Sequence, residues 1–402
     1  MLSSPLLKKN ADLYVFLPIL YTVWSDAVLT PSEIAAYRRD CTGAKGTVQE
    51  FISERYFGLT RNFLRYGWLV PYLFGASPAI CQSFLQGRKS DLQELVPGTL
   101  YGPYATSLRM SDLGYQNKAQ SGLKLCYNDL PTFLERLYDA VTTPWPDYQN
   151  IGIKRDGQWI QLNSNILQIE NEFYSSIRPK RTTGPCERPI TALAERGIQY
   201  VEVRCLDIDP TEPLGIAEQT ARFVDAFLLF CAIQESPPFA DSGWCPESAG
   251  NFASVVKQGR QPGLQLRYQG KELALATWAE QLLEQIGLCA EAFDSALGDT
   301  RYSKSVSAQR EKILNIEATP SARVLAHLKT TGMSYQDYAL AQSTEHAQRL
   351  RKTGLSPAES ALTAKQAEQS LSDQIALEAG DTEDFDEYVA RFHSALKRPS
   401  QS

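Results

Sequence analysis

The order in which strand-like and helix-like patterns follow one another constrains the fold of this chain most. Apolar residues recur at helical spacing over 47–66, and β-rich patterns occupy 158–174 and 198–208. A second helix is expected from the capping residues Asn128 and Asp129 to about Ala140. Further helical patterns lie near 215–235, 272–296, 320–329, 334–351, 357–378 and 384–396.

Strands followed by helices predict an α+β fold, because a wound α/β fold would alternate them. We expect residues 46–402 to form a single domain, strand-rich over 46–210 and helical over 211–402. The mostly polar helix at 357–378 is expected on the surface, where it would pack by a thin stripe of leucine and alanine. No GxGxxG or GxxxxGK[ST] motif is present, so a nucleotide would not be held by a Rossmann or P-loop cradle.

Composition excludes several function classes. The 402 residues carry a net charge of −6, which argues against a nucleic-acid partner. Eight cysteines form no CxxC pair, which predicts free thiols in a reducing cytoplasm. Only three histidines occur, too few to suggest a histidine-based triad. The apolar stretch 13–24 contains Pro18 and is too short to cross a membrane, so it is interpreted as a buried strand.

Three polar stretches could carry chemistry. If 161–174 stays extended, Gln168, Glu170, Glu172 and Tyr174 share one face, and the carboxylates would need a metal or basic partners. A solvated face balanced by the following basic residues is the simpler interpretation. The second stretch, 198–209, alternates a buried face (Val201, Val203, Cys205) with a polar face (Tyr200, Glu202, Arg204).

On that polar face, Glu202 could bind Mg²⁺ through hard oxygen atoms, and Arg204 could bind phosphate oxygens with its planar fork. An exposed salt-bridged strand explains the same pattern equally well. The third stretch, 101–118, surrounds Arg109 and Lys118 with glycines and small polar residues. Such a loop can bind an anion, although an ordinary turn-rich loop has the same composition.

Together these stretches resemble one family, the proteobacterial glutamate–cysteine ligases. The resemblance runs from about residue 50 to the C-terminus, and its motifs are long and in the family's order. They are Tyr66–Cys81, Ser107–Tyr115, Leu167–Glu172, Ile177–Arg181 and Tyr200–Asp207.

The resemblance implies a glutamine-synthetase-like architecture, with an antiparallel curved sheet and surrounding helices. It also implies the first step of glutathione biosynthesis. ATP phosphorylates the L-glutamate γ-carboxylate, and the amine of L-cysteine displaces the phosphate. Mg²⁺ and ATP would therefore bind. By position in the motifs, Glu202 matches a metal ligand, Arg109 and Arg204 match catalytic arginines, and Tyr115 and Tyr174 match tyrosines of the cysteine pocket. No role is assigned to Glu170, Glu172, Arg178 or Lys180.

Residues 1–45 match the family poorly, and no histidine stands where the family binds metal near 12–18. We therefore expect the fold to be incomplete at the N-terminus and the 402 residues to have weak or absent ligase activity. The alternative is a catalytically inactive relative that retains nucleotide or thiol binding. We further expect a cytoplasmic protein, monomeric, with neither nucleic-acid nor membrane partners.

Overall fold

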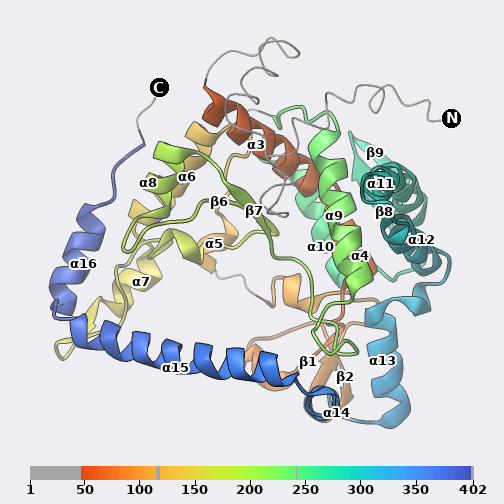
Figure 1. The fold of residues 1–402 in the computed structure, drawn as a ribbon. Coiled ribbons are helices and arrows are strands. Elements are labelled where there is room, and N and C mark those ends of the chain that lie inside the picture. Colours follow the sequence, from red (N-terminus) through yellow and green to blue (C-terminus); the bar gives the residue numbers. More distant parts are fainter. Residues whose placement is uncertain (1–46, 115–117, 241, 400–402) are drawn as a thin grey trace.

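The computed structural model describes residues 47–114, 118–240 and 242–399. The described chain combines helices with small antiparallel sheets (Figure 1). The helices are α3 (Val48–Tyr66), α4 (Leu69–Phe74), α5 (Lys118–Ser121), α6 (Leu130–Thr142), α7 (Pro146–Ile151), α8 (Pro189–Arg196), α9 (Glu218–Ile233), α10 (Pro246–Gln258), α11 (Leu275–Leu297), α12 (Arg301–Leu314), α13 (Pro320–Thr331), α14 (Tyr335–Thr353), α15 (Pro357–Gly380) and α16 (Phe385–Ser394).

The strands form four separate antiparallel units among the described residues. β3 (Thr99–Tyr101) lies between β1 (Ala79–Cys81) and β2 (Gln93–Val96). The other units are two-stranded: β4 (Lys154–Arg155) with β5 (Gln158–Trp159), β6 (Ile177–Lys180) with β7 (Tyr200–Val203), and β8 (Gln265–Tyr268) with β9 (Lys271–Ala274). The predicted α+β class with antiparallel pairing is confirmed.

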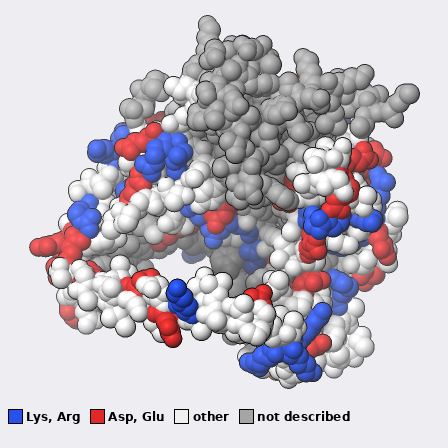
Figure 2. Space-filling view, in the orientation of Figure 1, with Lys and Arg blue, Asp and Glu red and all other residues white. Residues whose placement is uncertain are grey.

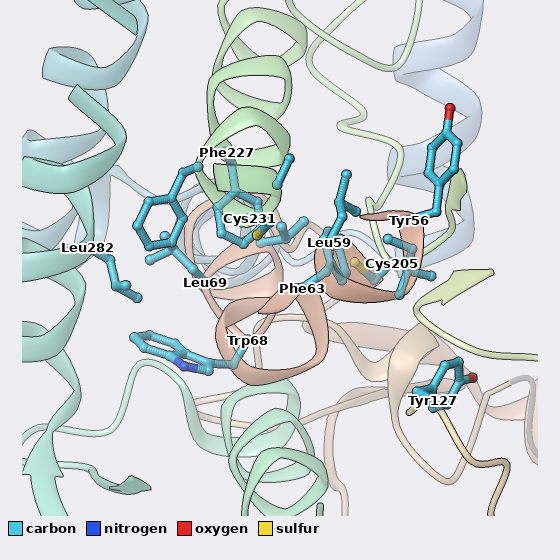
Figure 3. Packing of buried hydrophobic residues seen from close by; sticks show 14 of the residues in the cluster. Tyr56, Leu59, Phe63, Trp68, Leu69, Tyr127, Cys205, Phe227, Cys231 and Leu282 are labelled. Carbon is cyan, nitrogen blue, oxygen red and sulfur yellow. The ribbon is translucent and has the colours of Figure 1, made fainter. Parts of the chain in front are cut away.

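Helix α3 organises the largest core. Thr47 and Glu50 form a capping box that satisfies the free N–H groups at its first turn. Tyr56, Phe57 and Phe63 of α3 are buried, and the ring centroid of Phe63 lies 5.5 Å from that of Phe227 of α9, with the two rings tilted. Trp68, just after α3, lies 4.9 Å from Trp278 of α11 between ring centroids. Figure 3 shows Phe63 and Trp68 close to Phe227 of α9 and Leu282 of α11, so α3 shares one core with these later helices.

Most of the predicted helices are confirmed within a few residues, because their caps are local. Asp129 accepts a hydrogen bond from the N–H of Thr132 and begins α6, and Ser356 forms a capping box with Glu359 at the start of α15. Helices α8, α10 and α12 and the β8–β9 hairpin were not predicted. None of the helices in the described chain is long and apolar enough to cross a membrane.

The predicted strand at 158–174 is wrong. Only Gln158 and Trp159 form a strand, Asn165 makes an isolated bridge with Pro144, and Glu170–Glu172 form a short 3₁₀ turn. The polar side chains of this stretch bond nearby backbone instead: Asn163 binds the carbonyl of Gln168, and Gln168 accepts from the N–H of Leu162. Asparagine and glutamine thereby give the backbone an alternative to a sheet ladder.

The helix predicted at 357–378 lies on the surface as α15, but the expected packing stripe is wrong. All of its residues are exposed, and Leu371 keeps 67% of its surface accessible. Figure 1 shows why: α15 crosses one side of the molecule from α14 to α16 without lying on the body.

A buried ion pair joins the 3₁₀ turn to α8. Both oxygens of Glu170 contact the guanidinium of Arg188, at 3.1 Å from Nε and 2.9 Å from Nη2. Both side chains are 2% exposed, and the Arg188 guanidinium also stacks on Phe392 of α16 at 4.3 Å. This pair therefore fastens three separate segments.

We expect Arg188→Met to lower the free energy of unfolding by about 3 kcal/mol, because a buried carboxylate loses its partner. Urea unfolding followed by fluorescence measures the change. The control, Arg196→Met, breaks the partly exposed pair with Glu187 and should change stability much less. Equal effects of the two substitutions would contradict this role of Glu170 and Arg188.

Candidate active site

The β6–β7 hairpin builds one charged face. Its register places Arg178 directly opposite Glu202 and Lys180 opposite Tyr200, and directly opposed residues share a face. Arg178 is buried and donates to Glu202 Oε2 at 3.0 Å. It also donates to the carbonyls of Asn171 and Phe173, at 3.0 and 2.5 Å. Arg178 thus fixes both Glu202 and the turn that precedes Tyr174.

Four of the five predicted site residues lie together. The guanidinium of Arg204 is 3.8 Å from Glu202 Oε2 and lies over the ring of Tyr174, 5.1 Å from its centroid. Arg109 donates to the Tyr174 hydroxyl at 3.1 Å, and that hydroxyl donates to the Arg204 carbonyl at 3.3 Å. The fifth residue, Tyr115, lies outside the described residues.

Sequence reasoning missed Asp207, which holds this group in place. Its buried carboxylate accepts four hydrogen bonds: Arg109 Nε at 2.7 Å, Ser77 Oγ at 2.8 Å, the N–H of Ala76 at 2.9 Å and Ser107 Oγ at 3.0 Å. The alternation that buries Val203 and Cys205 continues to Asp207. A carboxylate on a buried face requires a cation nearby, and that signal could have identified it.

The electrostatics of the group follow from these contacts. Burial lowers the pKa of Arg109, but the hydrogen bond and charge of Asp207 outweigh it, so the net pKa is raised. Burial raises the pKa of Tyr174 against the opposing charges of Arg109 and Arg204. Arg109 therefore stays a cation, and Tyr174 stays a neutral phenol that can donate a hydrogen bond.

Arg109 and Arg204 differ in what their guanidiniums already bind. Arg109 additionally donates from Nη2 to the carbonyls of Arg204 and Leu206, at 3.2 and 2.9 Å. Within the described chain, the Arg204 guanidinium donates no hydrogen bond and is about one-third exposed. The geometry makes Arg109 an anchor and leaves the planar fork of Arg204 available for an oxyanion.

A cavity of about 520 Å³ adjoins Arg109 and Tyr174. Tyr127, Trp244 and Phe252 contribute to its mainly apolar wall, with Lys124 and Lys257 among its charged residues. Figure 2 shows that the molecule is hollowed above α15, with acidic and basic side chains visible inside the hollow. A small polar molecule could therefore reach this part of the structure.

Carboxylates are sparse around this site. No group of three or more metal-ligating side chains occurs among the described residues. Glu170 is paired with Arg188, and Glu172 accepts from the N–H of Gln168 at 2.7 Å. Glu202 uses Oε2 for both arginines, while its Oε1 makes no hydrogen bond or ion pair with a described residue. One available carboxylate oxygen suits Mg²⁺, which typically takes one or two carboxylates and completes its shell with phosphates and water.

Known structures first define the class of protein. A glutamate–cysteine ligase from Francisella tularensis in complex with AMP matches with a TM-score of 0.80 and 32% identity, over 96% of this chain and 77% of that chain. A bifunctional glutathione synthetase from Pasteurella multocida matches with a TM-score of 0.58 over 85% of this chain and 40% of that chain. At 20% identity, the second match shows the fold alone. The chain has the fold of a ligase.

Sequence comparisons then define the family. The glutamate–cysteine ligase family model matches residues 30–255. The glutamate–cysteine ligase of Bordetella parapertussis is 59% identical over 356 residues, which are 89% of this chain and 68% of that protein. That of Azotobacter vinelandii is 53% identical over 89% of this chain and 67% of its own length. This chain belongs to the glutamate–cysteine ligase family, as its motifs predict.

We expect Asp207→Asn to lower turnover by about 10²-fold, because the amide NH2 would meet two of the four donors, and the loss of the negative charge would release Arg109. ADP release measures turnover, and circular dichroism checks folding. The control is Asp139→Asn, a partly exposed aspartate on α6. Unchanged turnover in Asp207→Asn would show that Arg109 keeps its position without this carboxylate.

Proposed function

We propose that this chain carries out ATP-dependent ligation of L-glutamate to L-cysteine with the cluster of Arg109, Tyr174, Glu202 and Arg204. An oxygen of the glutamate γ-carboxylate attacks the γ-phosphorus of ATP, and ADP leaves. The cysteine nitrogen then attacks the acyl carbon, phosphate leaves and the nitrogen loses a proton. The observation that carries this proposal is the open guanidinium of Arg204 beside Glu202, held by the Arg109–Asp207 cluster.

Each residue has a distinct part in this proposal. Arg204 stabilises charge on the transferring phosphoryl group and the γ-carboxylate, because it is preorganised before substrate binds. Arg109 holds Tyr174 and the Arg204 backbone in register. Tyr174, with its hydroxyl on Arg109, forms part of the wall of the 520 Å³ cavity, where we place the cysteine amine. Tyr115 is proposed for the same pocket on the motif alone.

Glu202 would hold Mg²⁺ through Oε1. The ion, when bound with the triphosphate, would neutralise charge on the phosphate oxygens. Arg178 supports Glu202 from the buried side and fixes the direction of its carboxylate. Lys180 lies across the hairpin from Tyr200, and burial, together with the charges of Arg178 and Arg204, lowers its pKa against the opposing charge of Glu202. Because Lys180 shares a face of the hairpin with Glu202, its ammonium is placed to meet substrate anions.

We also propose a cytoplasmic monomer. Seven cysteines of the described chain are free thiols, as expected in a reducing compartment. Their location is mixed: Cys126, Cys205, Cys231 and Cys289 are buried, and Cys186 is exposed. The relatives that match over most of this chain are ligases by name, which favours an active enzyme over an inactive relative.

We expect Arg204→Ala to lower kcat by about 10²–10³-fold, because a preorganised group that stabilises transition-state charge is lost. KM for cysteine should change far less. The assay is ADP release that requires both glutamate and cysteine, with enough enzyme to detect a slow rate. Arg267→Ala, at an exposed arginine of β8, is the control. Wild-type kcat in Arg204→Ala would reject this role, and a preference for another amine would reject the cysteine assignment.

We expect Glu202→Gln to raise the Mg²⁺ concentration needed for half-maximal ADP release by about tenfold or more, because an anionic oxygen ligand becomes neutral. Titration of the rate against Mg²⁺ at fixed ATP measures it. Glu272→Gln on β9, exposed and remote in sequence, is the matched control. An unchanged Mg²⁺ requirement would place the metal ligand elsewhere.

A further inference from the structure

A second cavity lies on the other side of Asp207. Its volume is about 200 Å³, below the roughly 300–1,000 Å³ typical of drug-sized pockets, so it suits a small metabolite. The walls come from the loop after β7, the first turn of α9, the middle of α12 and the start of α13. Phe74, Leu206 and Asp207 of the family motifs line this cavity, but the proposed catalytic cluster of Arg109, Tyr174, Glu202 and Arg204 does not.

One part of the cavity is positive. The Lys312 ammonium donates to the carbonyl of Leu73 at 2.9 Å and lies 4.4 Å from the centre of the Phe74 ring. It forms no ion pair with a carboxylate in the described chain. Burial, together with the neighbouring charge of Arg323, lowers the pKa of Lys312 to about 8. An anion in the cavity would relieve this unfavourable environment.

The first turn of α9 adds to the positive part. Its N-cap is Ala217, which has no side-chain acceptor for the free N–H groups of the turn. Gln219 and Thr220 of this turn are among the residues that line the cavity. A helix N-terminus without a cap favours a bound carboxylate or phosphate.

Other lining residues offer acceptors. The carboxylate of Glu212 makes no hydrogen bond or ion pair with a described residue. Gln309 is 2% exposed, and its Oε1 has no hydrogen-bond partner in the described chain. Asp209 also lines the cavity, but it already accepts from Thr211 and pairs with Arg323 at 3.3 Å. An unpaired cation and an unpaired anion therefore line one small cavity without contacting each other.

We propose that this cavity binds a small zwitterionic α-amino acid. Its carboxylate pairs with Lys312 and the first turn of α9, and its ammonium pairs with Glu212. A rotation of the Gln309 amide group would let Oε1 accept a further hydrogen bond from the same ammonium. A simple anion would satisfy Lys312 but would meet Glu212 and Asp209 with the wrong sign. The ligand is thus recognised by its two opposite charges.

The position of Asp207 gives the site a consequence. This carboxylate lines the cavity and also holds Arg109. A ligand bound in the cavity would therefore act on the position of Arg109 in the catalytic cluster. A bound amino acid that favours one position of Asp207 would change the affinity for substrate. By linkage, bound substrate would change the affinity for the amino acid by the same factor.

The test is calorimetric titration of the full chain with L-alanine, which has the two backbone charges but neither a thiol nor a second carboxylate. We expect L-alanine to bind the wild type and Arg204→Ala equally. Binding should weaken at least tenfold in Lys312→Met and in Glu212→Gln. Methionine keeps an apolar side chain against Phe74, and glutamine keeps the shape of Glu212. Thermal unfolding should show a matching loss of ligand-dependent stabilisation.

Comparison ligands separate the alternatives. Sodium acetate and inorganic phosphate test the anion alone, and methylammonium tests the cation alone. Each should bind at least tenfold more weakly than L-alanine. Equal binding of phosphate or acetate would overturn the zwitterion proposal in favour of an anion site. Absent L-alanine binding, or binding lost in Arg204→Ala and kept in Lys312→Met, would overturn it as well.

Discussion

The buried carboxylate of Asp207 is the constraint on which the candidate active site depends. It gathers donors from the segment after α4, from the loop after β3 and from Arg109. A carboxylate removed from water is strongly destabilising unless each of its oxygens is satisfied. Both oxygens of Asp207 accept two hydrogen bonds, so three segments distant in sequence are brought to one point.

Charge is distributed unevenly over the neighbouring hairpin. Arg178 is buried, donates to two carbonyls from Nη1 and donates to Glu202 from Nη2. Glu202 is therefore held mainly by Arg178, at 3.0 Å, and only loosely by Arg204, at 3.8 Å. Because Arg178 supplies most of the charge compensation for Glu202, Arg204 keeps its guanidinium open while it remains beside a carboxylate. A site prepared in this way needs little reorganisation when charge develops.

The sequence predicted features that depend on neighbours in the chain. Thr47 and Asp129 cap helices through contacts three residues away, and the β7 alternation correctly placed Glu202 beside Arg204. The prediction of a strand at 158–174 failed because side-chain amides in this stretch compete with a sheet for the backbone groups. The partners of Asp207 lie 98 to 131 residues away in sequence, so no local pattern could indicate them. Tyr115 is predicted from its motif alone and lies outside the described residues.

Along the segment that begins with β7, Glu202 and Arg204 are partly exposed, whereas Cys205 and Asp207 are buried and face the core. Asp207 belongs to the core-facing set, yet it touches Arg109 on one side and lines the Lys312 cavity on the other. A packed interior responds to a change by switching arrangement and not by deforming smoothly. Because the Asp207 carboxylate lies 2.7 Å from Arg109 Nε, we expect a ligand that moves Asp207 to shift Arg109 as well.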